Sequence, residues 1–173
     1  MTLKEEESAY IAGFLDGDGC IMLQLIYRKD YKLGYQIRAS IVFYQKTEKR
    51  KFLSWLKTIF KVGYIRDRRD NISEYTIVGV NPVKKVLLLL LPYLRLKRGQ
   101  AILALSVLSK MPGSGRDVNP ELLLNLSCKV DEFARLNYSK RRTNVSSKVR
   151  KFLELHRLLN PVETDPKGET HFK

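Results

Sequence analysis

The segment from residue 9 to residue 22, AYIAGFLDGDGCIM, constrains the fold of this chain more than any other stretch. Its apolar spacing predicts a helix that ends at Asp16 and Asp18 and is followed directly by a strand. We expect the helix to begin at the capping-box pattern of residues 2–5 and to stop around Asp16, with Gly17 as a left-handed cap. A helix C-terminus already carries partial negative charge, so two further carboxylates there are unfavourable unless a cation arrives.

Small residues are the second unusual feature of this segment. Gly13 lies in the interior of the predicted helix, where glycine costs about 1 kcal/mol relative to alanine. Ala9 and Ala12 lie beside it and complete a small face on which another backbone can pack closely. From these residues alone, packing against the protein's own core and packing against a partner explain the face equally well.

The paired aspartates indicate a site for a hard cation. Carboxylate and backbone carbonyl oxygens suit Mg²⁺ or Ca²⁺. An EF-hand loop is excluded, because with Asp16 at position 1 the required glycine would be Ile21 and the required glutamate would be Tyr27. A plain Asp-Gly turn remains the alternative when the letters are read in isolation.

Charge and composition restrict the partner. The chain of 173 residues has a net charge of +14 and a hydrophobic fraction of 44%, which fits a folded domain that binds a polyanion, nucleic acid first of all. Thirteen Lys or Arg residues against three acids lie between Arg28 and Arg69, where strands are expected. A membrane surface is the alternative, but the longest apolar run, Val86–Leu91, is far shorter than the roughly 20 residues that span a bilayer.

The N-terminus and the cysteines bear on the compartment. Glu5, Glu6 and Glu7 make the N-terminus unlike a signal peptide or a typical transit peptide. Cys20 and Cys128 lie far apart and are expected to be two reduced thiols. We therefore expect an intracellular protein, in an organelle or in a prokaryotic cytoplasm.

Four strands in two hairpins are expected, without crossover helices between them. The clearest is Tyr35–Phe43, where odd positions are apolar or small and even positions are mostly polar. This order predicts an α+β fold whose antiparallel sheet has one covered and one open face. The other expected strands are residues 21–28, 62–68 and 74–80. Further helices are expected from Thr47, from Asn81-Pro82 to Pro92, over residues 96–110, from Asn119-Pro120, and over residues 145–159.

The stretch AYIAGFLDGDG resembles the motif of the LAGLIDADG homing endonucleases. The resemblance to small single-motif members of the family extends from residue 8 to about residue 155. The segments that carry it are Gln45-Lys46-Thr47, residues 63–68, residues 92–97, Val130-Asp131 and Leu136-Asn137.

This resemblance implies a four-stranded antiparallel sheet with helices packed on one face and a two-fold homodimer through the motif helix. One domain is expected over residues 1–160, followed by a polar, mobile tail over residues 161–173. Asp16 is expected to close the end of the helix. The expected dimer interface consists of Ala9, Ala12, Gly13 and Asp16.

The resemblance also implies an activity. The family cuts both strands of a long, roughly palindromic duplex DNA by metal-assisted phosphodiester hydrolysis, and an intron-encoded origin is expected. Mg²⁺ is the expected cofactor, and Ca²⁺ is expected to bind without supporting cleavage; no membrane partner and no small-molecule substrate are expected. The metal ligands implied are Asp18 and the carbonyl of Gly17. The catalytic residues implied are Asp18, Gln45 as the residue that orients water, Lys97 and, less directly, Lys49, the two lysines being plain surface residues in the alternative interpretation.

The open face of the sheet is expected to contact DNA, because arginine and glutamine side chains pair with guanine and adenine in the major groove. A maturase that binds structured RNA and a non-catalytic DNA-binding regulator remain alternative functions on the same fold. The expected DNA-binding residues are Gln24, Ile26, Arg28, Tyr31, Gln36, Arg38, Ser40, Val42, Arg66, Arg68, Glu74 and Thr76.

Overall fold

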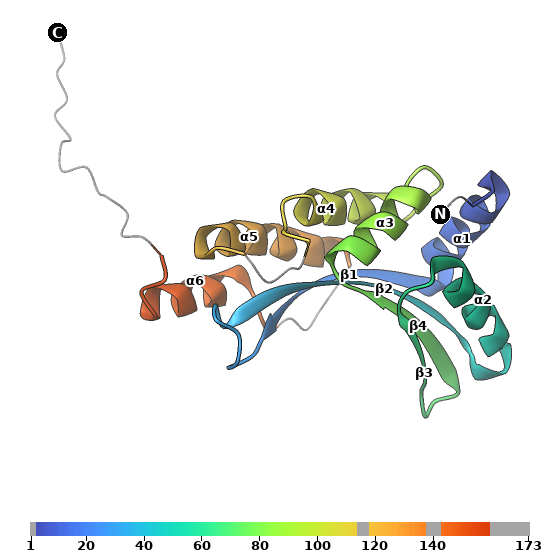
Figure 1. Ribbon diagram of the computed structural model, residues 1–173, viewed down its shortest axis with the longest axis horizontal. Helices are drawn as coiled ribbons and strands as arrows, with labels where there is room; N and C mark the ends of the chain where they lie inside the picture. Colours follow the sequence, from blue (N-terminus) through green and yellow to red (C-terminus); the bar gives the residue numbers. More distant parts are fainter. Residues whose placement is uncertain (1–2, 114–117, 138–142, 160–173) are drawn as a thin grey trace, which may run out of the picture.

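A four-stranded antiparallel sheet forms the centre of the computed structural model, which describes residues 3–113, 118–137 and 143–159 (Figure 1). The strand order is β1-β2-β4-β3, so that each hairpin pairs its own strands and β2 joins the two hairpins through β4. This arrangement confirms the α+β class and the antiparallel sheet. The strands are β1 (Gly19–Tyr27), β2 (Tyr35–Lys46), β3 (Tyr64–Asp67) and β4 (Ile72–Val78).

The helices cover one face of the curved sheet and leave the other face open (Figure 1). Helices α1 and α2 lie together at one end of the molecule, and α6 lies at the other end, beside the β1–β2 loop. Within the described residues, no helix is both long enough and apolar enough to cross a membrane. The helices are α1 (Glu5–Asp18), the short 3₁₀ helix η1 (Thr47–Lys49), α2 (Arg50–Phe60), α3 (Val80–Leu90), α4 (Arg98–Leu108), α5 (Pro120–Leu136) and α6 (Ser146–Leu155).

The register of the strands assigns every side chain to one face. Ile21 pairs with Ile41 and Leu25 with Ile37, and these odd-numbered residues are buried under the helices. Successive side chains in a strand point to opposite faces, so even-numbered residues make up the other surface. We call this surface the open face, and its members include Gln24, Ile26, Gln36, Arg38, Ser40, Val42, Arg66, Glu74 and Thr76.

Helix α1 ends later than the sequence pattern indicates. It continues to Asp18, and its C-cap is Gly19 in an extended conformation with φ of −121°, so the left-handed cap expected at Gly17 is wrong. The reason is that β1 begins at once. A Cβ on Gly19 would lie 2.5 Å from Leu15 Cδ1 and 2.9 Å from the Leu15 carbonyl oxygen, so only glycine allows this close passage from helix to strand.

The start of α5 confirms the sequence prediction, whereas the start of α3 does not. Asn119 caps α5 as expected, and its Oδ1 accepts a hydrogen bond of 2.7 Å from the Leu122 amide. Helix α3 instead begins at Val80, with Gly79 at φ of 111° as its N-cap, and not at Asn81. The expected tail over residues 161–173 lies outside the described residues.

The free edge of β1 is covered by side chains and not by another strand. Asn137 Nδ2 donates to the Ile21 carbonyl at 2.8 Å, and Asn144 Nδ2 donates to the Leu25 carbonyl at 2.9 Å. An unpaired strand edge is a template for unwanted pairing with another chain. The two amides satisfy carbonyl groups near both ends of this edge.

Candidate active site and nucleic-acid interface

The two aspartates at the end of α1 have different environments. Asp16 is buried, and its carboxylate accepts hydrogen bonds from three backbone amides, those of Arg95 at 2.6 Å, Leu96 at 3.0 Å and Lys97 at 2.8 Å. These amides compensate its charge, so Asp16 closes the helix end as expected. The carboxylate is therefore engaged within its own protomer, and its place in the dimer interface stays a prediction.

Asp18 is exposed at the last position of α1. Within the described residues, its carboxylate makes no hydrogen bond and no ion pair. The carbonyl of Gly17 belongs to the last turn of the helix, where carbonyl groups have no intrahelical partner. Hard oxygen donors are therefore presented together at an exposed helix end, which is the donor chemistry that Mg²⁺ and Ca²⁺ prefer.

Lys97 lies at the same junction. Its Nζ donates a hydrogen bond to the Asp16 carbonyl oxygen, where the partial negative charge of the helix end favours a cation. The Cys20 thiol on β1 lies close to it: burial raises the pKa of Cys20, and the positive charge of Lys97 partly opposes that rise. The loop that binds Asp16 thus also delivers a cationic side chain to the start of β1.

Gln45 and Lys49 lie farther along β2 and beyond it. Gln45 is two residues past Phe43, the partner of Gly19, and so belongs to the same end of the sheet as Asp18. Its Oε1 accepts a hydrogen bond of 2.9 Å from the Lys46 amide. Lys49 ends η1 as an exposed residue, and within the described residues it makes no hydrogen bond or ion pair with Asp18 or Lys97.

A polar network that sequence reasoning missed ties the β3–β4 hairpin to η1 and α2. Asp67 Oδ1 accepts hydrogen bonds from Ser73 Oγ at 2.7 Å and from Arg50 Nε at 2.9 Å. Ser73 also bonds Thr47 at 3.1 Å. The Ser73 hydrogen bond, followed by that of Arg50, lowers the pKa of Asp67. The network fixes the hairpin that carries Arg66 against the start of α2.

The outer surface of α1 exposes glycines that the protomer itself does not need. A Cβ added to Gly13 or Gly17 would meet no atom within 4 Å apart from its chain neighbours and the nearby backbone of its own helix. Ala9 is exposed on the same side of the helix. Ala12, by contrast, is fully buried in the protein's own core, so its assignment to the dimer interface is wrong. Packing against the protein's own core is thereby excluded as the reason for Gly13.

Large apolar side chains flank this exposed surface. Tyr10 is 58% exposed and packs edge-on against Phe52 and Trp55 of α2, with ring centroids 5.9 and 6.3 Å apart. Leu96, in the loop that binds Asp16, is 78% exposed. The surface around the exposed glycines is therefore apolar at its margins.

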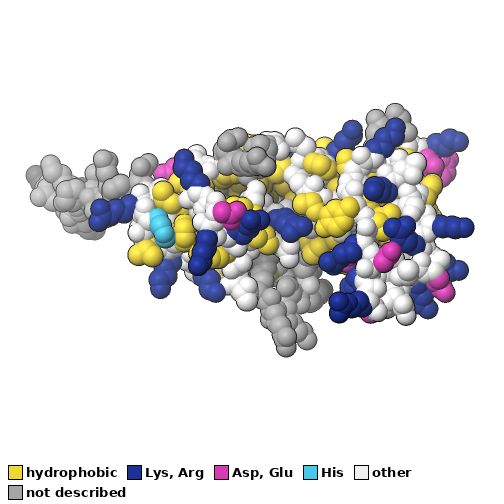
Figure 2. Space-filling view, turned by 60° about the horizontal axis from the view of Figure 1, so that its bottom comes forward, with side chains coloured by type: hydrophobic (Ala, Val, Ile, Leu, Met, Phe, Trp, Pro, Cys, Tyr) yellow, Lys and Arg dark blue, Asp and Glu magenta, His cyan; other side chains and the backbone are white. Residues whose placement is uncertain are grey.

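The open face combines a buried floor with an exposed basic periphery. Figure 2, in which the underside of Figure 1 is turned forward, shows Lys and Arg side chains spread over the molecule with few acidic ones among them. Gln24, Arg28, Arg38, Arg66 and Arg68 are exposed. The floor consists of Ser40, Val42, Thr76 and Glu74, with 3%, 3%, 5% and 9% exposure. Strands β2 and β4 have neighbouring strands on both sides, so few atoms of these four side chains are accessible. Their contact with DNA stays a prediction.

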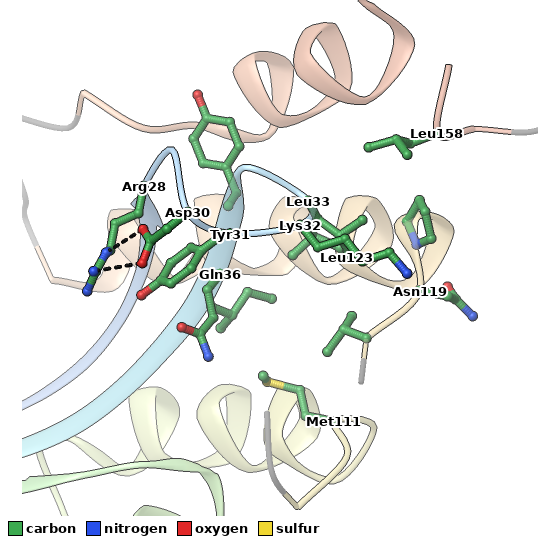
Figure 3. Close-up of a pocket in the computed structure, with 14 residues that line it drawn as sticks. Arg28, Asp30, Tyr31, Lys32, Leu33, Gln36, Met111, Asn119, Leu123 and Leu158 are labelled. Atoms are coloured by element: carbon green, nitrogen blue, oxygen red, sulfur yellow. Dashed lines mark hydrogen bonds and ion pairs between the residues drawn. The ribbon is translucent and has the colours of Figure 1, made fainter. Parts of the chain in front are cut away.

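Three arginines of this face and its loops are paired with acids. Arg28 makes two hydrogen bonds to Asp30, Nε to Oδ1 at 2.9 Å and Nη2 to Oδ2 at 2.8 Å, and its guanidinium lies 5.3 Å from the centre of the Tyr31 ring. Figure 3 shows this pair beside a cavity of about 1000 Å³ that lies under the β1–β2 loop. The other pairs are Arg66–Glu74 at 2.8 Å and Arg68–Asp70 at 2.7 Å.

Known proteins are similar to this chain in both sequence and fold. The model of the LAGLIDADG endonuclease family matches residues 11–98. The DNA endonuclease I-CvuI of Chlorella vulgaris is 38% identical over 146 residues, covering 84% of this chain and 89% of the relative. The DNA endonuclease I-CreI of Chlamydomonas reinhardtii is 37% identical over 145 residues, covering 84% of this chain and 87% of the relative.

Solved structures give the same result. The crystal structure of the homing endonuclease I-CvuI with its target in the presence of 2 mM Ca has a TM-score of 0.83 and 35% identity, covering 90% of this chain and 97% of that one. I-CvuI with the I-CreI target in 2 mM Mg, in which the DNA is not cleaved, has a TM-score of 0.84 at the same identity, covering 90% and 98%. With a motif helix that ends at Asp18, a saddle of four antiparallel strands and this similarity over most of its length, the chain belongs to the LAGLIDADG endonuclease family.

Proposed function

We propose that this chain is a homing endonuclease that acts as a homodimer and makes a double-strand break in a long, roughly palindromic DNA target. Family membership and the two relatives, which are both named DNA endonucleases, support the assignment. The observation that carries it is the carboxylate of Asp18, which is exposed and has no partner among the described residues, at the end of a helix that exposes Gly13 and Gly17.

The homodimer follows from the exposed surface of α1. Gly13 costs its helix about 1 kcal/mol, and the protomer gains no packing from it. Because Gly13 and Gly17 have no side chain, the backbone of a second copy of α1 could approach this surface closely. Because Asp18 ends the same helix, a two-fold axis along this surface brings one Asp18 from each protomer to the centre of the dimer.

The metal would be held by Asp18 and the Gly17 carbonyl of each protomer. The described residues of one protomer contain no cluster of three His, Cys, Asp or Glu side chains that could bind an ion. Mg²⁺ keeps several waters and needs few protein ligands when phosphates complete its shell. When bound, the metal neutralises charge at the scissile phosphate and lowers the pKa of the attacking water. Activity should therefore require both protomers and the DNA.

Three further residues of the chain would take part in catalysis. Lys97 holds a positive charge at the α1–β1 junction, where it would stabilise charge on the cleaved phosphate. Gln45 lies at the same end of the sheet and would orient water. Lys49 would contact DNA from the exposed end of η1.

The open face would lie in the major groove. Strand β1 has 9 residues and spans about 30 Å, so two protomers cover on the order of 15–20 base pairs. The exposed readers would be Gln24, Arg28, Arg38, Arg66 and Arg68, with Ile26, Tyr31 and Gln36 beside them. We also propose an intron-encoded, intracellular protein, in keeping with its two free thiols.

The test is incubation of the protein with Mg²⁺ and a library of long duplexes, scored by sequencing of double-strand breaks. We expect recurrent cuts at one target, abolished in Asp18→Asn. Binding of one duplex sequence without any break would support a non-catalytic regulator. Binding of structured RNA in preference to duplex DNA would support a maturase.

A further inference from the structure

We propose that Asp30, Asp70 and Glu74 are specificity-determining residues, each of which orients one arginine of the DNA-contacting surface and suppresses its attraction to phosphate. This inference rests on the proposed function, because it concerns how the same surface distinguishes its target from other DNA. The observation behind it is a repeated arrangement: Arg28 pairs with Asp30, Arg66 with Glu74, and Arg68 with Asp70.

The three pairs lie at opposite ends of the open face. The Arg28–Asp30 pair belongs to the loop between β1 and β2, which begins where Tyr27 pairs with Tyr35. The other two pairs belong to the β3–β4 hairpin, beside the far end of β2, where Lys46 pairs with Ile72. An arrangement that recurs at both ends is not a local accident of one turn. Carboxylates are unfavourable on a surface that binds a polyanion, so their recurrence there needs a reason.

Stereochemistry supplies one part of the reason. Guanidinium carries five N–H groups in a fixed plane. In Arg28, Nε and Nη2 donate to the two oxygens of Asp30. One N–H of Nη2 and both of Nη1 remain, and these form the edge that can donate to O6 and N7 of a guanine. The carboxylate therefore orients the guanidinium and leaves its base-reading edge open.

The surrounding backbone keeps the Arg28–Asp30 pair in place. Within the loop, the Arg28 amide donates to the Gly34 carbonyl at 3.0 Å and the Tyr31 amide donates to the Arg28 carbonyl at 3.1 Å. Gly34 adopts φ of 67°, and a Cβ there would lie 2.5 Å from Cε1 of Phe152 on α6. The loop is thus packed tightly against α6, and the pair is presented on a rigid support.

Electrostatics supplies the other part. An arginine with no acidic partner binds any phosphate and therefore any DNA sequence. A paired arginine gains little from a phosphate because the carboxylate repels it, whereas guanine offers acceptors without a full negative charge. Glu74 is the clearest case, because its side chain is only 11% exposed while that of Arg66 is 65% exposed. The acid is fixed in the floor, and the arginine extends from it.

The experiment compares Asp30→Asn with Glu132→Gln. Both substitutions remove one charge from a half-exposed ion pair, but the Lys129–Glu132 pair lies on α5, which packs on the covered face of the sheet. The probe is a 30-base-pair duplex of unrelated sequence, titrated by fluorescence anisotropy at several salt concentrations. A duplex library with randomised positions then gives the base preference at each position.

We expect Asp30→Asn to bind the unrelated duplex severalfold more tightly, with a slope of log K against log salt steeper by about 0.9 for each guanidinium released to a phosphate. Base preference should weaken at one position of each half-site. Glu132→Gln should leave the slope and the preference as in the wild type. Adding Asp70→Asn and Glu74→Gln to Asp30→Asn should make the salt slope steeper still. A thermal melt verifies that this variant is folded.

An Asp30→Asn variant with the slope and base preference of Glu132→Gln would overturn the inference. Because the titration needs no cleavage, that result leaves the proposed function standing whenever the wild type cuts the library. A wild type that shows no base preference and no cleavage would overturn the proposed function instead. An increased base preference in Asp30→Asn would also contradict the inference, since the carboxylate would then be hindering recognition.

Discussion

The backbone amide of Lys97 donates to the Asp16 carboxylate at 2.8 Å, while the ammonium group of the same lysine donates to the Asp16 carbonyl oxygen. One aspartate therefore holds one lysine at both its backbone and its side chain. Asp16 is buried, and the loop it binds is 79 to 81 residues away in the sequence. The end of α1 therefore determines where the proposed catalytic lysine lies.

Asp16→Asn should destabilise the protein. An asparagine amide group would turn an N–H donor toward backbone amides that now share carboxylate oxygens, which leaves at least one buried donor unpaired. The expected cost is about 2 kcal/mol, since an unsatisfied buried polar group typically costs 1–3 kcal/mol. Urea unfolding monitored by circular dichroism measures it. Asp18→Asn is the matched control, because that exposed side chain has no hydrogen bond or ion pair to lose among the described residues; equal stability of the two variants would contradict the role of Asp16.

The strands were predictable from the sequence, whereas the surface of α1 was only partly so. Alternation over Tyr35–Phe43 assigns core and open faces correctly because a strand has a period of two that sequence displays directly. In α1, Ala12 and Gly13 lie three and four residues after Ala9, so helical spacing assigns both of them to one small face with it. Which of the two faces outward depends on where the protein's own sheet lies.

Long-range polar contacts could not be predicted either. Thr47 and Ser73 lie 26 residues apart, and their link to Asp67 arises only when η1 and the β3–β4 hairpin meet. The acids that pair with Arg28 and Arg68 lie two residues from them, a spacing visible in the sequence. Local turn geometry decides whether such residues meet, so the sequence alone does not identify Asp30 and Asp70 as partners of these arginines.

Gly13→Leu should separate the dimer without unfolding the protomer. The protomer has open space at this position, so the substitution should even favour the helix by about 1 kcal/mol, while a leucine would hold two α1 helices apart. Sedimentation velocity across micromolar concentrations measures the assembly. Asn125→Leu, at another exposed helix position, on α5, is the control and should stay dimeric. A wild type that sediments as a stable monomer would refute the proposed dimer.

Stability should depend on the Asp67 network in a defined pH range. Hydrogen bonds from Ser73 and then Arg50 lower the pKa of Asp67 in the folded state. Its contribution is therefore fully present above the unfolded value near 3.9 and is lost as pH falls through the lower folded value. Comparing urea midpoints, wild type should exceed Asp67→Asn at pH 7, and the gap should narrow below about pH 4. The urea midpoint of Ser73→Ala should change less with pH than that of the wild type. A difference in midpoint between wild type and Asp67→Asn that does not change with pH would contradict this account.

Asp18→Asn should separate DNA binding from DNA cleavage. The amide preserves the size of the side chain but removes the charge that would hold the metal, so cleavage should fall by several orders of magnitude. Affinity for the target should persist, because the open face and its arginines are unchanged, and it should rise slightly without divalent ions because one negative charge near phosphate is gone. Gel-shift affinity and cleavage rate on one target measure both effects. Lys97→Met, which removes a cation but leaves Asp18, should reduce cleavage less severely. Undiminished cleavage by Asp18→Asn would place the metal site elsewhere, and the exposed carboxylate at the end of α1 would then have no catalytic role.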